Sequence, residues 1–296
     1  MQKFNYHTHT RRCGHADNNM TDEDFVKLFI QKGFKKIAFT DHCPEKEEID
    51  HRKNMRMKYS EKDEYLNSIK SLKEKYKDII KIETGFEVEY LPGQEENLFE
   101  LKNETDKIIL GQHFIYNDNK SELLIFRRHN FSDKELLRYA EYIKLAVEKN
   151  IPDIIAHPDL FMLGRNKFGD VEKQVSNIIC SVAEQYGVPL EINLSDPNLY
   201  LLGEKDKIEY PCKEVWKIAS EYKNLKVIYG VDAHFEYQIM NYEKAIEVAN
   251  KHIGQDVIDK LHFCNKRLDI EWENQYIDNY IKIKNERSEA IGDKNE

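Results

Sequence analysis

The chain has 296 residues, of which 40% are hydrophobic and 33% charged, so it can build a sizeable core in one large α/β domain or two smaller ones. Its net charge of -9 argues against a general nucleic-acid or anionic-membrane binder, because both usually need a basic surface. The five cysteines are scattered without a C-x-x-C pair, the first residues form no basic and apolar leader, and no apolar run approaches membrane-spanning length. We therefore expect a soluble, cytoplasmic protein without a nucleic-acid or membrane partner, whose oligomeric state these patterns do not set.

Short β-rich runs alternate with helical patterns along the chain. The runs cover residues 4–6, 36–39, 79–86, 107–110, 153–156, 189–192 and 226–229. The first helical pattern starts near Asp24 and leads to Gly33 as a helix C-cap. Ser132 starts another with a capping box, and further patterns cover residues 65–72, 171–186, 212–222 and 242–253.

Seven strands that alternate with helices predict parallel β/α units, either in a barrel or in a doubly wound sheet. We favour an α/β fold of the distorted (β/α)7 barrel type, because polar residues collect where the strands end. In such barrels the functional site lies at the C-terminal ends of the strands. We expect residues 1–283 to form this single domain and residues 284–296 to form a polar, frayed tail.

Nearly every predicted strand has a histidine or a carboxylate at its C-terminal end or just beyond it. In chain order these polar residues are His7, His9 and His15, Asp41 and His42, Glu87 and Glu89, His113, His157 and Asp159, Glu191 and Asn193, and Asp232 and His234. Seven of the eleven histidines fall in this set, whereas scattered histidines would lie mainly on exposed helix faces and loops. The pattern predicts one shared polar site.

The spacing of these residues favours metal binding. Residues two apart on a strand point to the same side, so His7 and His9 can hold one ion, and Asp232 and His234 have the same spacing. Imidazole suits zinc, iron and manganese, and a carboxylate can join two cations. The number of donors exceeds the three or four that one catalytic zinc needs, which favours two or three divalent ions.

Each motif also has a plain structural interpretation. A single H-x-H pair is weak evidence, Asp41 could cap a helix, and His157 before Pro158 could be a turn residue. Five separate coincidences at strand ends are hard to attribute to packing. The motifs therefore carry weight as a set.

Taken in order, the motifs resemble those of the polymerase-and-histidinol-phosphatase (PHP) family. They are H-x-H at His7, Thr-Asp-His at His42, Gly-x-Glu at Glu87, Gly-x-His at His113, Ala-His-Pro at His157 and Asp-x-His at His234. The resemblance runs from His7 to His234 and implies a distorted barrel with a trinuclear metal centre. Cys13-Gly14 before His15, the run from Phe86 to Tyr90 and the Ala-His-Pro-Asp-Leu segment are similar to the histidinol-phosphate phosphatase branch.

The resemblance implies a ligand set. One ion would take His7, His9, Glu87 and Asp232, a second would share Glu87 and add His113 and His157, and a third would take His15, His42 and His234. Glu89 remains an alternative to Glu87 as the shared ligand, because it lies on the same side of the strand. The implied activity is hydrolysis of a small phosphorylated substrate, L-histidinol phosphate, to L-histidinol and phosphate.

Metal-activated hydroxide would make a Ser or Cys nucleophile unnecessary, and neither G-x-S-x-G nor C-x5-R is present. Asp232, His234 and Asp159 are the candidates for assisting catalysis. Arginine suits phosphate, so Arg165 is the first candidate for phosphate binding and Arg128 the second, with Arg52 and Arg56 as weaker alternatives. Asn193 is a candidate for contact with the substrate, and Glu191 lies on the same face.

Several other functions remain open. A phosphodiesterase or exonuclease would need a basic groove, which the acidic balance disfavours, and an amidohydrolase would commonly use a modified lysine where this chain has Glu87. A phosphotyrosine phosphatase would share the metal site and differ in substrate. A non-catalytic metal-binding protein would have closed coordination and no turnover.

Overall fold

The computed structural model describes residues 1–46, 55–119, 123–125 and 130–264. Their main feature is an eight-stranded, wholly parallel sheet whose strands pair in the order in which they occur along the chain. Its strands are β1 (Phe4–Asn5), β2 (Lys36–His42), β3 (Lys81–Val88), β4 (Lys107–Leu110), β7 (Ile154–Ile155), β8 (Leu190–Asn193), β9 (Lys226–Gly230) and β10 (His262–Phe263). The seven predicted strands are all present. The two-residue strand β10 was not predicted.

The sheet curls until its first strand meets β9, and this seam is held mainly by single contacts. Thr8 and Ala233 form an isolated parallel bridge, in which His9 N donates to Ala233 O at 2.8 Å. Near the start of β1, the Gln2 side chain exchanges hydrogen bonds of 2.7 and 3.0 Å with the backbone of Tyr229. The predicted barrel is confirmed, with a seam that is more weakly paired than the rest of the sheet.

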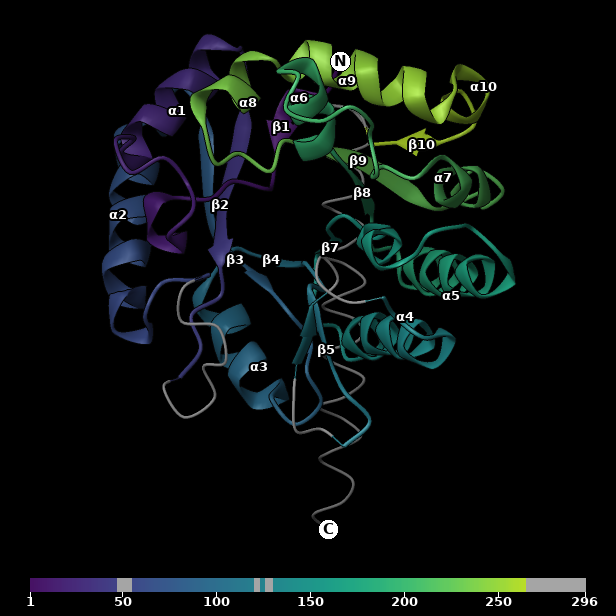
Figure 1. Ribbon diagram of the computed structural model, residues 1–296. Coiled ribbons are helices and arrows are strands. Elements are labelled where there is room, and N and C mark those ends of the chain that lie inside the picture. The colour runs from purple at the N-terminus through teal and green to yellow at the C-terminus, as the bar shows by residue number, and fades with distance from the viewer. Residues whose placement is uncertain (47–54, 120–122, 126–129, 265–296) are drawn as a thin grey trace.

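Helices surround the curled sheet, as Figure 1 shows in a view roughly along the barrel. They are α1 (Asp22–Gln31), α2 (Lys62–Lys75), α3 (Glu95–Glu104), α4 (Asp133–Glu148), α5 (Asp170–Tyr186), α6 (Ser195–Leu201), α7 (Lys213–Ala219), α8 (Glu236–Met240), α9 (Tyr242–Ile253) and α10 (Gln255–Ile258). The described residues also form three short 3-10 helices, η1 (Arg11–Cys13), η2 (Tyr59–Glu61) and η3 (Leu160–Gly164). The predicted capping box at Ser132 is present, and Gly33 after α1 has the left-handed φ of 74° that favours glycine.

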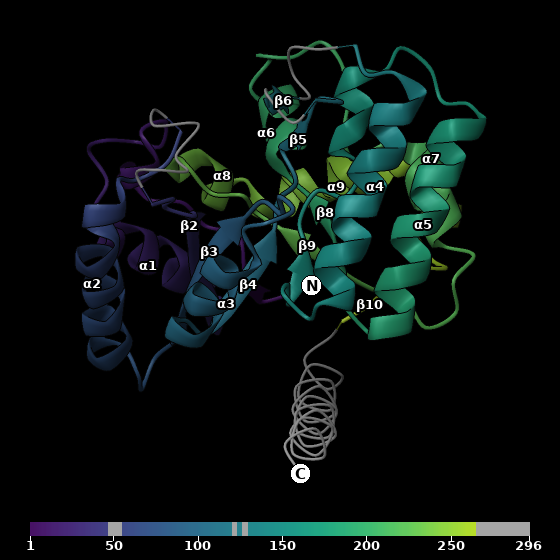
Figure 2. The ribbon, with the colours of Figure 1, turned by 90° about the horizontal axis from the view of Figure 1, so that it is seen from below.

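One element interrupts the β/α alternation. Directly after His113, β5 (Phe114–Tyr116) and β6 (Leu123–Ile125) form a separate antiparallel pair that the sequence did not predict. In Figure 2 this pair and α6 lie toward the upper end of the molecule, whereas β10 lies toward the lower end. The pair therefore stands over the end of the barrel where the strands finish.

Apolar side chains fill both sides of the sheet. Inside the barrel, Phe4, Tyr6, Ala38, Ile109, Ile154, Ala156, Ile228 and Cys264 form one cluster, and a larger cluster packs between the sheet and the helices. Each buried isoleucine in the inner cluster contributes about 1.5–3 kcal/mol by leaving water. No helix in the described ranges is both long and apolar enough to cross a membrane.

Candidate metal centre

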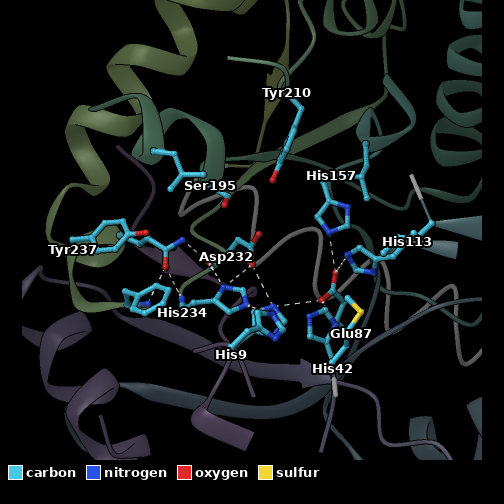
Figure 3. Close-up of a pocket in the computed structure, with 17 residues that line it drawn as sticks. His9, His42, Glu87, His113, His157, Ser195, Tyr210, Asp232, His234 and Tyr237 are labelled. Atoms are coloured by element: carbon cyan, nitrogen blue, oxygen red, sulfur yellow. Dashed lines mark hydrogen bonds and ion pairs between the residues drawn. The ribbon is translucent and has the colours of Figure 1, made fainter. Parts of the chain in front are cut away.

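Eight of the polar residues predicted at the strand ends line one cavity of about 450 Å³. Figure 3 shows imidazoles and carboxylates on its floor and larger side chains such as Tyr210 and Tyr237 on its walls. Of the predicted ligands, the cavity surface includes His9, His15, His42, Glu87, His113, His157, Asp232 and His234. His7 is fully buried next to this floor.

Four predicted ligands converge on one point. The Nε2 atoms of His7 and His9 lie 3.1 Å apart, and each is 3.3–3.4 Å from Asp232 Oδ1. Glu87 Oε2 lies 3.6 Å from the first imidazole and 3.4 Å from the second. Ligands about 2.1 Å from a tetrahedral ion lie about 3.4 Å from each other, so these four atoms are spaced to hold one cation.

The second oxygen of Glu87 faces a different pair of histidines. Its Oε1 lies 2.9 Å from His157 Nε2 and 3.6 Å from His113 Nε2. Glu89 instead lies 2.9 Å from His113 Nδ1 and 3.4 Å from the Arg56 guanidinium. The geometry therefore favours Glu87 over Glu89 as the carboxylate that joins the first two predicted ligand sets.

The third predicted set gathers near the opening of the cavity. The Nε2 atoms of His15 and His234 are 3.0 Å apart, and ligand atoms of His9, His42 and His234 lie within 4.8 Å of one another. The Nδ1 atom of His42 lies 3.0 Å from Glu87 Oε2. His42 thus connects the third predicted set to Glu87.

In most of the predicted ligand histidines, the ring nitrogen that faces away from the other ligands lies beside an oxygen atom. Glu191 accepts from His7 Nδ1, Glu89 lies beside His113 Nδ1, and the backbone carbonyls of Cys13 and Asp232 accept from His15 and His234. Asp41 lies 3.6 Å from His9 Nδ1. Such contacts fix the imidazole so that its other nitrogen faces a metal. Sequence reasoning did not assign this role to any of the three carboxylates, although each lies at a strand end.

A cation fits the donor set for a physical reason. Glu87 Oε2 is buried and has no hydrogen-bond partner among the described residues, although three imidazole nitrogens surround it. Burial raises the pKa of Glu87, but His42, His113 and His7 hold the pKa well below its usual value. Burial likewise lowers the pKa of His9, but the nearby carboxylates of Asp232 and Asp41 raise this pKa to about 9. An ionised, buried carboxylate needs a positive partner, and a divalent ion between these atoms would supply it.

The backbone is strained at two predicted ligands. His157 has φ of 30° and Asp232 has φ of 52°, in the region that residues other than glycine rarely adopt. Each residue lies two positions after the end of its strand, where the chain turns to present the side chain. Strain of this kind costs about 1–3 kcal/mol and is typical of functional sites.

Arg165, the first candidate for phosphate binding, contacts other parts of the protein. Arg165 donates to Glu172, to Phe131 O at 2.6 Å and to Asp133 at 2.7 Å, and it does not line the cavity. Arg165 thus connects the turn after η3 to α4 and α5. The prediction relied on its closeness to His157 in the sequence, but its side chain does not point into the cavity. Arg128 and Arg52 lie outside the described residues.

Asp159 points away from the cavity. Its Oδ2 accepts hydrogen bonds from Cys212 N at 2.5 Å and from Trp216 Nε1 at 3.0 Å. The positive φ at His157 turns the chain into η3, so the two-residue periodicity of a strand no longer holds at this position. Asn193 is also fully buried behind Asp232 and does not reach the cavity surface.

Comparison with known proteins agrees with this geometry. The family model of the PHP domain matches residues 5–195. The histidinol-phosphatase of Bacillus subtilis is 30% identical over 156 residues, a stretch that spans 50% of this chain and only 57% of that relative. A "Probable histidinol-phosphatase" of Deinococcus radiodurans is 24% identical over 239 residues, which cover 77% of this chain and 85% of that relative.

Two solved structures share the fold. A provisionally assigned histidinol phosphatase from Listeria monocytogenes matches with a TM-score of 0.65 at 22% identity, over 82% of this chain and 99% of that chain. A histidinol phosphate phosphatase from Lactococcus lactis, solved with zinc, L-histidinol and phosphate, matches with a TM-score of 0.61 at 18% identity, over 88% and 95% of the two chains. Because the family model matches more than half of the sequence and covers most of the motifs at the site, this chain belongs to the PHP domain family.

Proposed function

We propose that this chain is a metal-dependent phosphomonoesterase that hydrolyses L-histidinol phosphate to L-histidinol and phosphate. The observation that carries the proposal is the convergence of seven imidazoles and two carboxylates on the floor of one cavity. The relatives named histidinol-phosphatase, and the solved relative that holds zinc, L-histidinol and phosphate, support this substrate.

We assign two or three divalent ions, of zinc, iron or manganese, to this floor. His7, His9, Glu87 and Asp232 would hold the first ion, because the two imidazole nitrogens lie 3.1 Å apart and 3.3–3.6 Å from the two carboxylate oxygens. Glu87 with His113 and His157 would hold the second, and His15, His42 and His234 the third. A mixed imidazole and carboxylate set suits all three metals.

Bound metals would supply a hydroxide near neutral pH, neutralise the phosphoryl oxygens and stabilise the leaving oxygen. The protein's own part is to hold the donors in place and to shape the cavity. Glu87 keeps its two oxygens toward different histidines, and Asp232 and His234 lie at the cavity surface where the ester would bind. Asp159, which faces α7, takes no part in this scheme.

The cavity wall suits the organic part of the substrate. Phe235 and Tyr237 stack at a centroid distance of 5.6 Å, and Leu199, Tyr210 and Leu160 also line the wall. Flat aromatic surface of this kind packs well against an imidazole ring. The described lining includes no arginine or lysine. We therefore assign the phosphate contact to Arg128, which follows the lining residue Ile125 by three positions.

The five cysteines are buried and form no disulfide, which suits the reducing cytoplasm in which we expect the enzyme to work. The test of the proposed function starts with protein purified without added metal. Bound metals are counted by elemental analysis, and phosphate release is measured with L-histidinol phosphate, other small phosphomonoesters, a phosphotyrosine peptide and a short single-stranded DNA.

We expect two or three metals per chain and a strong preference for L-histidinol phosphate. Bound metals with a preference for another ester would keep the metal site and reject the substrate. The absence of both metal and turnover, even after manganese, zinc or iron is added back, would reject the proposed function.

A further inference from the structure

The geometry points to Glu191 and Asn193 on β8 as positioning residues that aim His7 and Asp232 at one shared ion. β8 supplies none of the proposed ligands, yet two of its side chains contact ligands that come from β1 and β9. This inference rests on the proposed metal site and adds a role for a strand that otherwise contributes nothing to it.

Glu191 holds His7 closely. Both of its carboxylate oxygens lie 3.0 Å from His7 Nδ1, and both residues are almost completely buried. A carboxylate in this place favours the imidazole form that carries its proton on Nδ1, and Nε2 is then free to bind a metal. The Nε2 atom is the one that faces His9 and Asp232.

Asn193 ties this carboxylate to a second ligand. Its Nδ2 donates to Glu191 Oε1 at 2.8 Å and lies 3.2 Å from Asp232 Oδ2. Its own Oδ1 accepts from Ser195 N at 2.8 Å, which fixes the amide so that its NH2 group faces both carboxylates. Because Oδ2 of Asp232 is held in this way, Oδ1 is turned toward His7 and His9.

Gly230 on β9 leaves the space that Glu191 occupies. A Cβ atom at position 230 would lie 2.0 Å from Glu191 Oε2 and 2.1 Å from its Cδ, far closer than real contacts allow. Gly230 has no positive φ, so its lack of a side chain matters for space and not for backbone conformation. An alanine here would push the carboxylate away from His7 without changing any charge.

The test measures cobalt(II) affinity of the full-length, metal-depleted chain by competition with a chelator, together with the visible spectrum of the bound cobalt. Glu191→Gln keeps the size of the side chain and removes its charge, and Gly230→Ala displaces the same side chain. We expect each change to weaken cobalt binding about 10- to 100-fold and to alter the spectrum. The matched control is Glu83→Gln, a buried glutamate on β3 that pairs with Lys36 and Lys81 and not with the cavity.

A double variant tests whether Gly230→Ala acts through the carboxylate. If it does, Glu191→Ala combined with Gly230→Ala should bind cobalt no more weakly than Glu191→Ala alone, because the clash has been removed. Additive losses, or normal cobalt affinity in a folded Glu191→Gln variant, would overturn the inference. Wild-type protein that binds no cobalt would overturn the proposed function first, and this inference with it.

Discussion

Alanine at position 111 should disable the metal centre through a steric effect alone. The added Cβ atom would lie 1.8 Å from Glu87 Oε1, 2.5 Å from its Cδ and 2.8 Å from its Cγ. The carboxylate would have to move by more than about 1 Å to reach an ordinary contact distance. Metal ligation tolerates changes of only about 0.2 Å in a ligand distance.

Because Glu87 is proposed to serve two ions, its displacement should release metal and lower kcat by about 100-fold or more. The overpacking should also lower the free energy of unfolding by about 1–3 kcal/mol. Elemental analysis, phosphate release and urea unfolding measure the three effects. Gly169→Ala is a matched control, since its Cβ would meet only Glu172 Oε2, at 3.3 Å. A Gly111→Ala protein with its full metal content and kcat within about twofold of wild type would refute this reasoning.

Four further predictions follow from the site. Replacing His9 or Asp232 by alanine should remove metal and lower turnover by about 100-fold in a chain that stays folded by circular dichroism; near-normal turnover without metal would contradict the mechanism. Stripping metal from the wild type with a chelator should lower stability, by about 4 kcal/mol where free metal had stood near 1,000 times Kd, and calorimetry should show recovery when metal returns. Arg165→Ala should lower the free energy of unfolding in urea by about 1–3 kcal/mol and leave KM within about twofold. Arg128→Ala should instead raise KM, and the opposite pattern would support Arg165 as the phosphate contact. Asp159→Ala should likewise lower the free energy of unfolding by about 1–3 kcal/mol, and kcat of the folded protein should fall by less than about tenfold.

The sequence was informative about the site because two simple rules act together. The carboxyl ends of parallel strands meet at one end of a barrel, and polar residues at those ends must then lie close together. This reasoning located His7, His113 and Asp232 near one another without any knowledge of side-chain geometry. It also predicted the seven strands that carry them.

The directions of individual side chains could not be read from the sequence. Arg165 and Asp159 follow His157 closely, but the turn at its positive φ sends both toward neighbouring helices. Asn193 was expected to meet the substrate, and it lies instead behind Asp232. Each outcome depends on contacts between elements that are distant in the sequence, and local patterns do not encode these contacts.

The seam between β1 and β9 bears on how the chain folds. The other pairs in the eight-stranded sheet join strands that follow one another in that sheet, whereas the Thr8–Ala233 bridge joins two residues that lie far apart in the sequence. Closing so long a loop is entropically costly, so we expect the seam to form late and to open first. An ion bound by His7, His9 and Asp232 would link the residues that follow β1 to those that follow β9 and so stabilise the seam. Amide hydrogen exchange at His9 and Ala233 should therefore be fast in metal-free protein and slow once metal is bound, while exchange between β2 and β3 changes little.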